Sequence, residues 1–392
     1  MVSTAARIYP LLGLLGGYAV VMLSNPIRLA LRDGFRCILR FKRVWLTFAL
    51  FGFAYFVFQF ATFTPLQRSA DLDFTQFSSI GSWQWPRLAD VWRETPLPAV
   101  EAVAGLFDCA TTTYPLSIVA AVLLVVNWKG LHGDLLKALR KRYRLWSYLI
   151  YLVVLLSAFA ALLKPVIFWR LPAWRGTMPE AGLLQISATV DTVAFIFEYL
   201  FGVYIQVYLI TVCLAWVKGL SFTEDGLFQF AVRRFSYALK WAGVVIVVST
   251  CLVRAPLLIA YFREVPDVLD YLPLERALMS GLIILFSSVQ ISLALHNESL
   301  RAALHANAEF LRRNATRFGW FLLLCALHFW ALIACDAIVR GAVADRVAAL
   351  IGWRIIFVCL RGLLTGWLLA SWVSLFRQCE TGRVTQESWI KY

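Results

Sequence analysis

Six charged residues lie inside, or at the edge of, long apolar stretches of the sequence. They are Asp191, Glu198, Arg254, Asp336, Arg354 and Arg361. A charge in hydrocarbon costs at least about 2.5 kcal/mol, so such residues pair with an opposite charge or line a wet cavity, and they are functional candidates by default. These six residues therefore form the candidate site.

Three of these charges lie at the same predicted depth in the membrane. If the outer boundaries of their apolar stretches are near residues 190, 262 and 353, then Glu198, Arg254 and Arg361 each lie about eight residues inward, or roughly 12 Å along an α-helix. We expect Glu198 to pair with Arg361 or Arg254, because opposite charges at one depth compensate each other. One guanidinium would remain, and it would favour an anionic ligand such as a carboxylate or a lipid phosphate.

The other three charges extend this candidate site toward the outer face. Asp191 lies one heptad before Glu198, Arg354 lies one heptad before Arg361, and Asp336 is near the outer end of its own apolar stretch. Together the residues predict an outward-facing polar site for an anionic small molecule or lipid. The alternatives are a structural ion pair that holds helices together, and side chains that snorkel to the membrane surface.

The elements that must position these charges are transmembrane helices. Of the 392 residues, 61% are hydrophobic and 15% are charged, whereas soluble domains have about 45–50% apolar and about 25% charged residues. This excludes a water-soluble fold and predicts an all-α, polytopic bundle of helices in one membrane domain, 1–392. The eight predicted spans are 44–64, 108–128, 145–168, 193–217, 241–262, 277–296, 318–339 and 353–376. A ninth apolar stretch, 8–23, is short for a span, and it either crosses tilted, lies at the interface or re-enters.

Lysine and arginine predict the orientation of these spans. They favour one set of connections over the other by roughly two to one, and positively charged short loops stay in the cytoplasm. The C-terminal tail, 377–392, falls on that side, while the long connection 65–112 is expected to form a partly irregular cap outside. The Arg-, Ala- and Leu-rich composition is typical of bacterial inner-membrane proteins, so we expect a multi-pass protein of the cell membrane.

Four basic segments on the cytoplasmic side also have helical patterns. They are 26–43, 129–144, 218–240 and 297–317. In the first segment, Arg28, Arg32, Arg36 and Arg40 recur every four residues, which keeps them along one stripe of a helix. We expect such amphipathic helices to lie on the anionic inner leaflet with their apolar side toward the membrane. The alternatives are that they only enforce the topology, or that they bind a membrane protein partner.

Small residues within the spans give a weaker signal. Gly362 and Gly366 form a G-x-x-x-G pair, which predicts a tight helix crossing. Ser288, Ser292 and His296 recur every four residues in the sixth span. They either line an inner exit or allow close packing, and packing is the commoner role of serine in a buried helix.

No catalytic motif occurs in the sequence. The phosphate-binding G-x-x-x-x-G-K-[ST] pattern, H-E-x-x-H and G-x-S-x-G are all missing, so we expect no cofactor, no metal ion and no enzymatic activity. The net charge of +14 follows from the basic loops, and nucleic acid is not an expected partner. The predicted function is that of a transporter-like, channel-like or lipid-handling protein. The alternatives are a non-catalytic scaffold or subunit of a membrane complex and, less favoured, an enzyme that acts on lipid phosphates.

Overall fold

The computed structural model of the chain consists of α-helices, and its described residues contain no strand. The described residues are 25–50, 52–53, 96–108, 152–160, 180–217, 224–251, 272–295, 299–343 and 347–379. They confirm the predicted all-α class. The doubtful stretch 8–23, the basic segment 129–144, nearly all of the predicted span 108–128 and the second half of the predicted span 241–262 lie outside the described residues.

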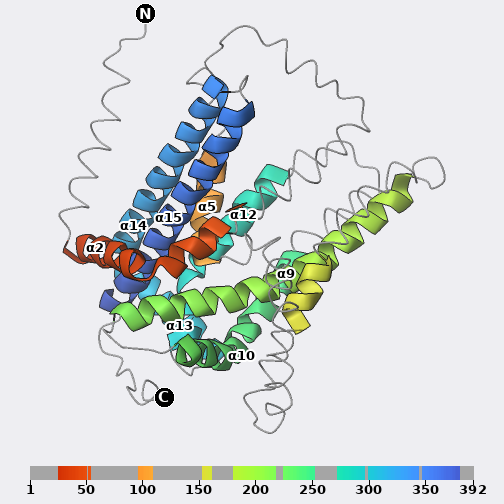
Figure 1. Cartoon of the computed structure of the whole chain (residues 1–392). Coiled ribbons are helices and arrows are strands. Elements are labelled where there is room, and N and C mark those ends of the chain that lie inside the picture. The colour runs from red at the N-terminus through yellow and green to blue at the C-terminus, as the bar shows by residue number, and fades with distance from the viewer. Residues whose placement is uncertain are drawn as a thin grey trace, which may run out of the picture.

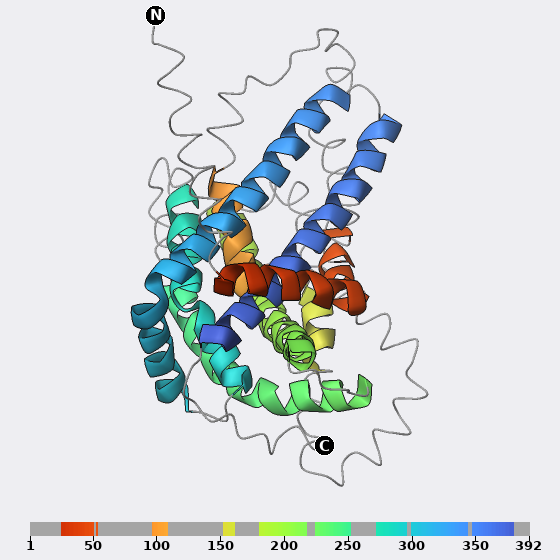
Figure 2. The same ribbon diagram turned by 90° about the vertical axis from the view of Figure 1, so that its left-hand side faces the viewer.

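The labelled helices run through the chain in the order of Figure 1. They are α2 (Asn25–Arg40), α5 (Pro96–Phe107), α9 (Glu180–Val217), α10 (Glu224–Ser249), α12 (Leu272–Leu285), α13 (Ser287–Leu295), α14 (Leu300–Val343) and α15 (Val347–Cys379). Shorter helical stretches cover 42–50, 52–53 and 152–160. Helices α14 and α15 form a long hairpin, and α2 lies across α15 (Figures 1 and 2).

Among the residues that the structure describes, three helices are long and apolar enough to cross a membrane. The apolar segments are Ile196–Val217 in α9, Leu300–Ala342 in α14 and Ala349–Cys379 in α15. Helices α12 and α13 together make a fourth, which is bent by 42° where they meet. These lengths and compositions identify a membrane-embedded protein, because hydrocarbon about 30 Å thick requires about 20 apolar helical residues. The full set of eight spans stays a prediction.

One of the predicted basic segments is continuous with a span, and another joins its span at a kink. Helix α10 includes most of 218–240, and no proline interrupts it, so its backbone hydrogen bonds continue into the apolar part. Helix α14 includes nearly all of 297–317, but it is kinked at Asn314, where φ is −123° and ψ is 18°. At the start of α14 the Ser299 hydroxyl accepts a hydrogen bond from the backbone N–H of Ala302 (3.3 Å), which is a helix cap.

Helix α2 confirms the first predicted basic segment, but part of its apolar side packs on protein. Its sequence opens with Asn25 and Pro26, residue types that are favoured where a helix begins. A buried stripe along the helix contains Ile27, Ala30, Leu31, Gly34, Cys37 and Ile38. This part of the apolar side packs against α15 and α9, while Phe35 and Leu39 stay exposed, and contact of the helix with lipid stays a prediction.

Glycines allow the N-terminal helices to approach α15 closely. A Cβ atom at Gly34 would lie 2.6 Å from the backbone nitrogen of Ser371. A Cβ atom at Gly362 would lie 2.6 Å from the backbone nitrogen of Ala49, and one at Gly366 would lie 2.9 Å from the Cα of Trp45. The G-x-x-x-G pair thus marks the tight crossing that its spacing predicts.

An aromatic core joins α5, α14 and α15. Trp372 of α15 is buried, and its ring centroid is 5.1 Å from that of Phe107 and 5.0 Å from that of Phe318. Phe310 and Phe321 of α14 also lie within 6 Å of it. Such edge-to-face and offset contacts add to the gain from burying the rings.

Helix α5 departs from the cap predicted for 65–112. Only the end of that segment is described, and there Ala99 and the run from Ala102 to Phe107 are buried in the core. These residues are buried because almost all of them are apolar.

Candidate functional site

The structure brings Asp336 and Arg354 together near the connected ends of α14 and α15. The Asp336 carboxylate is 5% exposed, and Arg354 donates to its Oδ2 at 3.4 Å. Arg340, one turn along α14, places its Nε 3.0 Å from the same oxygen. The indole N–H of Trp353 donates to the other oxygen, Oδ1, at 3.0 Å. One carboxylate thus accepts two hydrogen bonds and forms ion pairs with two arginines, one from each helix.

The charges of this cluster do not cancel. Two guanidinium groups share the single carboxylate of Asp336, so the cluster carries one surplus positive charge. The side chains of Arg340 and Arg354 are 42% and 31% exposed. Their free N–H groups can therefore reach a ligand, and a guanidinium binds a carboxylate or phosphate through two parallel hydrogen bonds.

The surroundings of the cluster are apolar. Exposed isoleucine and leucine side chains lie on both sides of Arg354 along α15, at Ile351, Ile355, Ile356 and Leu360. A Trp side chain beside arginines at the end of apolar helices is typical of the membrane interface.

The other sequence-predicted residues are not all placed. Glu198 is half-buried in α9, and Arg361 is exposed on α15. Asp191 belongs to the backbone of α9, but its side chain is not described, and Arg254 lies outside the described residues. The predicted pairing of Glu198 with Arg361 or Arg254 therefore stays a prediction.

Sequence reasoning missed Arg340, although a signal for it was present. Arg340 follows Asp336 by four residues, and residues at this spacing lie next to each other on a helix. Sequence reasoning also missed the buried carboxylate of Asp108, which accepts a hydrogen bond from the Tyr199 hydroxyl at 2.6 Å. About two turns after Tyr199 along α9, buried Gln206 donates to the carbonyl of Phe107 at 3.0 Å. These bonds hold the end of α5 against α9.

The break between α12 and α13 is a second polar feature that the sequence did not reveal. Asn307 of α14 donates from Nδ2 to the carbonyl of Leu285 at 3.0 Å. Its Oδ1 accepts from the Ser288 hydroxyl at 2.5 Å and from the Ser288 backbone N–H at 3.3 Å. One buried side chain thus bonds both sides of the break, and the bend is a fixed part of the fold.

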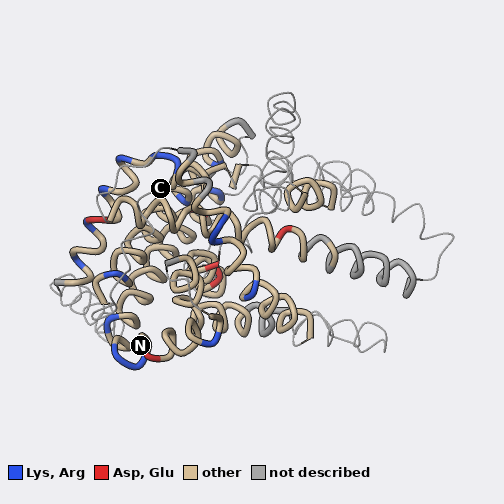
Figure 3. Tube along the Cα trace, turned by 90° about the horizontal axis from the view of Figure 1, so that it is seen from below, with Lys and Arg blue, Asp and Glu red and all other residues tan. Residues whose placement is uncertain are grey.

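Most of the exposed basic residues in the described part of the chain lie on α2, α10 and α14. Figure 3 shows Lys and Arg along the rim of the molecule when it is seen from below. The residues are Arg28, Arg32, Arg36 and Arg40 of α2, Arg233 and Lys240 of α10, and Arg301, Arg312, Arg313 and Arg317 of α14, together with Lys42 of the short helix 42–50. On α14 they all precede the predicted span 318–339.

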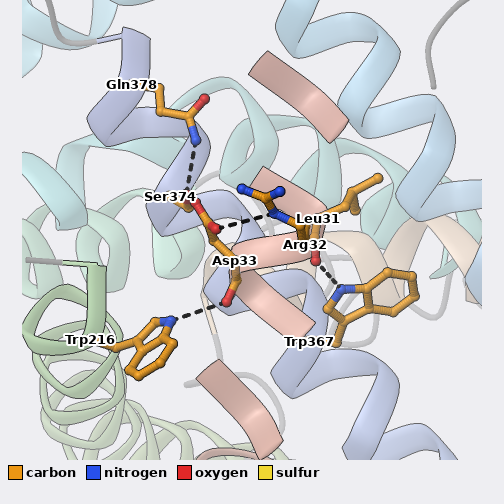
Figure 4. A network of polar contacts seen from close by, with 7 residues as sticks. All are labelled: Leu31, Arg32, Asp33, Trp216, Trp367, Ser374 and Gln378. Carbon is orange, nitrogen blue, oxygen red and sulfur yellow. Dashed lines mark hydrogen bonds and ion pairs between the residues drawn. The ribbon is translucent and has the colours of Figure 1, made fainter. Parts of the chain in front are cut away.

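Indole groups fix α2 in the position that presents its arginines. Trp367 donates to the carbonyl of Leu31 at 2.8 Å, and Trp216 donates to the carbonyl of Asp33 at 3.2 Å (Figure 4). The Arg40 guanidinium lies over the Trp216 ring, 5.3 Å from its centroid. These contacts from α15 and α9 hold the helix by its backbone, so its outward face stays available.

Among the described residues, no group of three His, Cys, Asp or Glu side chains gathers where it could hold a metal ion. Comparison of the chain with protein-family models, with curated proteins and with solved structures finds no match.

Proposed function

We propose that this chain is a multi-pass membrane protein of the transporter-like or lipid-handling class that binds an anionic group between α14 and α15. The observation that carries the proposal is the cluster of Asp336, Arg340 and Arg354, in which two partly exposed guanidinium groups share one buried carboxylate. The ligand is a carboxylate or phosphate, either free or in a lipid headgroup. The proposed ligand is an anion, as the sequence predicts, and the site combines two of the predicted residues, Asp336 and Arg354, with Arg340.

The basic helices support a second contact with lipid. The outward face of α2 carries its arginines beside Phe35 and Leu39, which are 51% and 61% exposed. A helix with exposed arginines and large apolar side chains is suited to an anionic leaflet, where each basic residue contributes about 1 kcal/mol. We place this surface, and the C-terminus with it, on the cytoplasmic side, with the Asp336 cluster toward the outer leaflet.

Substitutions at the cluster test the anionic site. The full-length protein is purified in detergent, and its thermal stabilisation by phosphatidylglycerol, phosphatidylcholine or inorganic phosphate is titrated. Asp336→Asn leaves two uncompensated guanidinium groups and should tighten anion binding about fivefold, which corresponds to about 1 kcal/mol after screening of partly exposed charges. Arg340→Gln keeps the contact of Asp336 with Arg354 and should weaken binding. His305→Ala, at an exposed position of α14 outside both the cluster and the exposed Lys and Arg residues, is the control and should bind like the wild type.

The outcomes separate the alternatives. Stabilisation by phosphatidylglycerol alone identifies a lipid headgroup, whereas stabilisation by phosphate as well identifies a free anion. A purely structural ion pair predicts that Asp336→Asn and Arg340→Gln lower the unfolding temperature and leave anion affinity unchanged. That result would remove the proposed site.

A further inference from the structure

Buried polar groups without protein partners follow the break between α12 and α13. Gln290 is 2% exposed, and within the described part of the chain neither its Nε2 nor its Oε1 has a hydrogen-bond partner. The hydroxyls of Ser287 and Ser292 are in the same situation, at 3% and 1% exposure. This differs from Ser288, whose hydroxyl is bonded to Asn307.

Such groups are costly in a dry interior. A carboxamide has two donor hydrogens and an oxygen that accepts twice. Each buried group left without a partner costs about 1–3 kcal/mol. Ordered water or a hydrogen-bonding solute removes this cost, and buried waters occur at sites of this kind. The side chains of α13 are therefore suited to contact with water or solute inside the bundle.

Two of the three polar groups share one side of α13. Ser287 and Gln290 are three residues apart and so lie on one face of the helix, whereas Ser292, five residues after Ser287, lies on a different side. Val289 and Leu293 pack with Trp241 of α10. Directly after the end of α10, the Thr250 hydroxyl is also buried without a partner among the described residues. Helix α10 packs directly on α13.

The polar positions extend along the broken span. Ser280 of α12 is buried, as are Ser287, Gln290 and Ser292 of α13. From Ser280 to Gln290 the chain advances roughly 15 Å at the helical rise, which is about half of the hydrocarbon thickness of about 30 Å. Groups spread over this distance fit a path better than a single binding pocket.

We propose that α13 lines a hydrated path through which small uncharged molecules that both donate and accept hydrogen bonds cross the membrane. Helix α13 carries no ionisable side chain, and an ion taken out of water needs a compensating charge or many oriented dipoles. Water and small solutes such as glycerol or urea share the chemistry that the carboxamide and hydroxyls recognise. The path is distinct from the anionic site, which lies at the other end of α14 from Asn307.

Stopped-flow light scattering on liposomes that contain the full-length protein tests this proposal. Shrinkage in impermeant sucrose reports water permeability, and re-swelling in glycerol or urea reports solute permeability. Gln290→Leu keeps the size of the side chain and removes its hydrogen bonds, so it should slow permeation about fivefold, the factor expected for one lost hydrogen bond. Gln378→Leu, at the end of α15, is the matched control and should permeate like the wild type.

Each outcome decides the proposal. If the protein speeds only the shrinkage in sucrose, compared with empty liposomes, the path conducts water. If it also speeds the re-swelling in glycerol or urea, the path conducts small solutes. Equal rates for the wild type and empty liposomes, or for Gln290→Leu and the wild type, overturn it. If Gln290→Leu does not fold, Ser287→Ala is measured instead. A dry interior predicts in addition that Gln290→Leu unfolds at a higher temperature than the wild type.

Discussion

Replacing Asn307 by alanine should destabilise the protein far more than the loss of a few side-chain atoms suggests. Asn307 donates to the carbonyl of Leu285 at 3.0 Å and accepts from the Ser288 hydroxyl and backbone N–H at 2.5 Å and 3.3 Å. Each hydrogen bond contributes about 1 kcal/mol net, so the three together give about 3 kcal/mol. The substitution also leaves buried backbone groups on both sides of the break without a partner, which adds to the cost.

The free energy of unfolding in mixed detergent micelles measures this effect, with helix content followed by circular dichroism. His305→Ala is the matched control, because His305 is exposed on the same helix two residues away. We expect the control to unfold within about 0.5 kcal/mol of the wild type, as surface substitutions do. An Asn307→Ala variant as stable as this control would refute the view that α14 holds the break between α12 and α13.

Two further predictions test the packing of α15 and α2. Gly362→Ala should lower the free energy of unfolding by about 1–3 kcal/mol, because its Cβ would lie 2.6 Å from the Ala49 nitrogen. A Cβ atom at Gly319 would have no atom within 4 Å, so Gly319→Ala should instead raise the free energy of unfolding by up to about 1 kcal/mol. Chemical denaturation of both variants measures this difference. The thiols of Cys37 in α2 and Cys213 in α9 are in hydrogen-bonding contact, so mild copper-catalysed oxidation should cross-link them within one chain, as seen by peptide mapping. A Cys37→Ser variant should lose the cross-link, and failure of the wild type to form it would place α2 elsewhere.

The sequence predicts the helices well because their signals are local. Apolar length alone identifies α9, α14 and α15 as spans, and the four-residue spacing of arginines identifies α2. Which surface covers the apolar side of α2 is not a local property. The contacts from Trp216 and Trp367, far along the chain, decide that part of it packs on protein.

The candidate site is predictable in part for a similar reason. The intramembrane charges of Asp336 and Arg354 are visible in the sequence, and the four-residue step to Arg340 is visible too. The bend at Phe286 is not visible, since neither proline nor glycine lies there. The bend depends on Asn307 of α14, whose side chain donates a hydrogen bond to the backbone carbonyl of Leu285.

Labelling from the two sides of the membrane tests the central claim most directly, namely that α14 crosses the bilayer and brings the Asp336 cluster to the outer surface. All eight native cysteines are replaced by serine, and a single cysteine is then introduced by Arg301→Cys or Gly341→Cys. Intact cells that contain either variant are treated with a membrane-impermeant maleimide. The account predicts labelling at position 341 on intact cells and at position 301 only after the membrane is permeabilised. Labelling of both positions from the same side would contradict it.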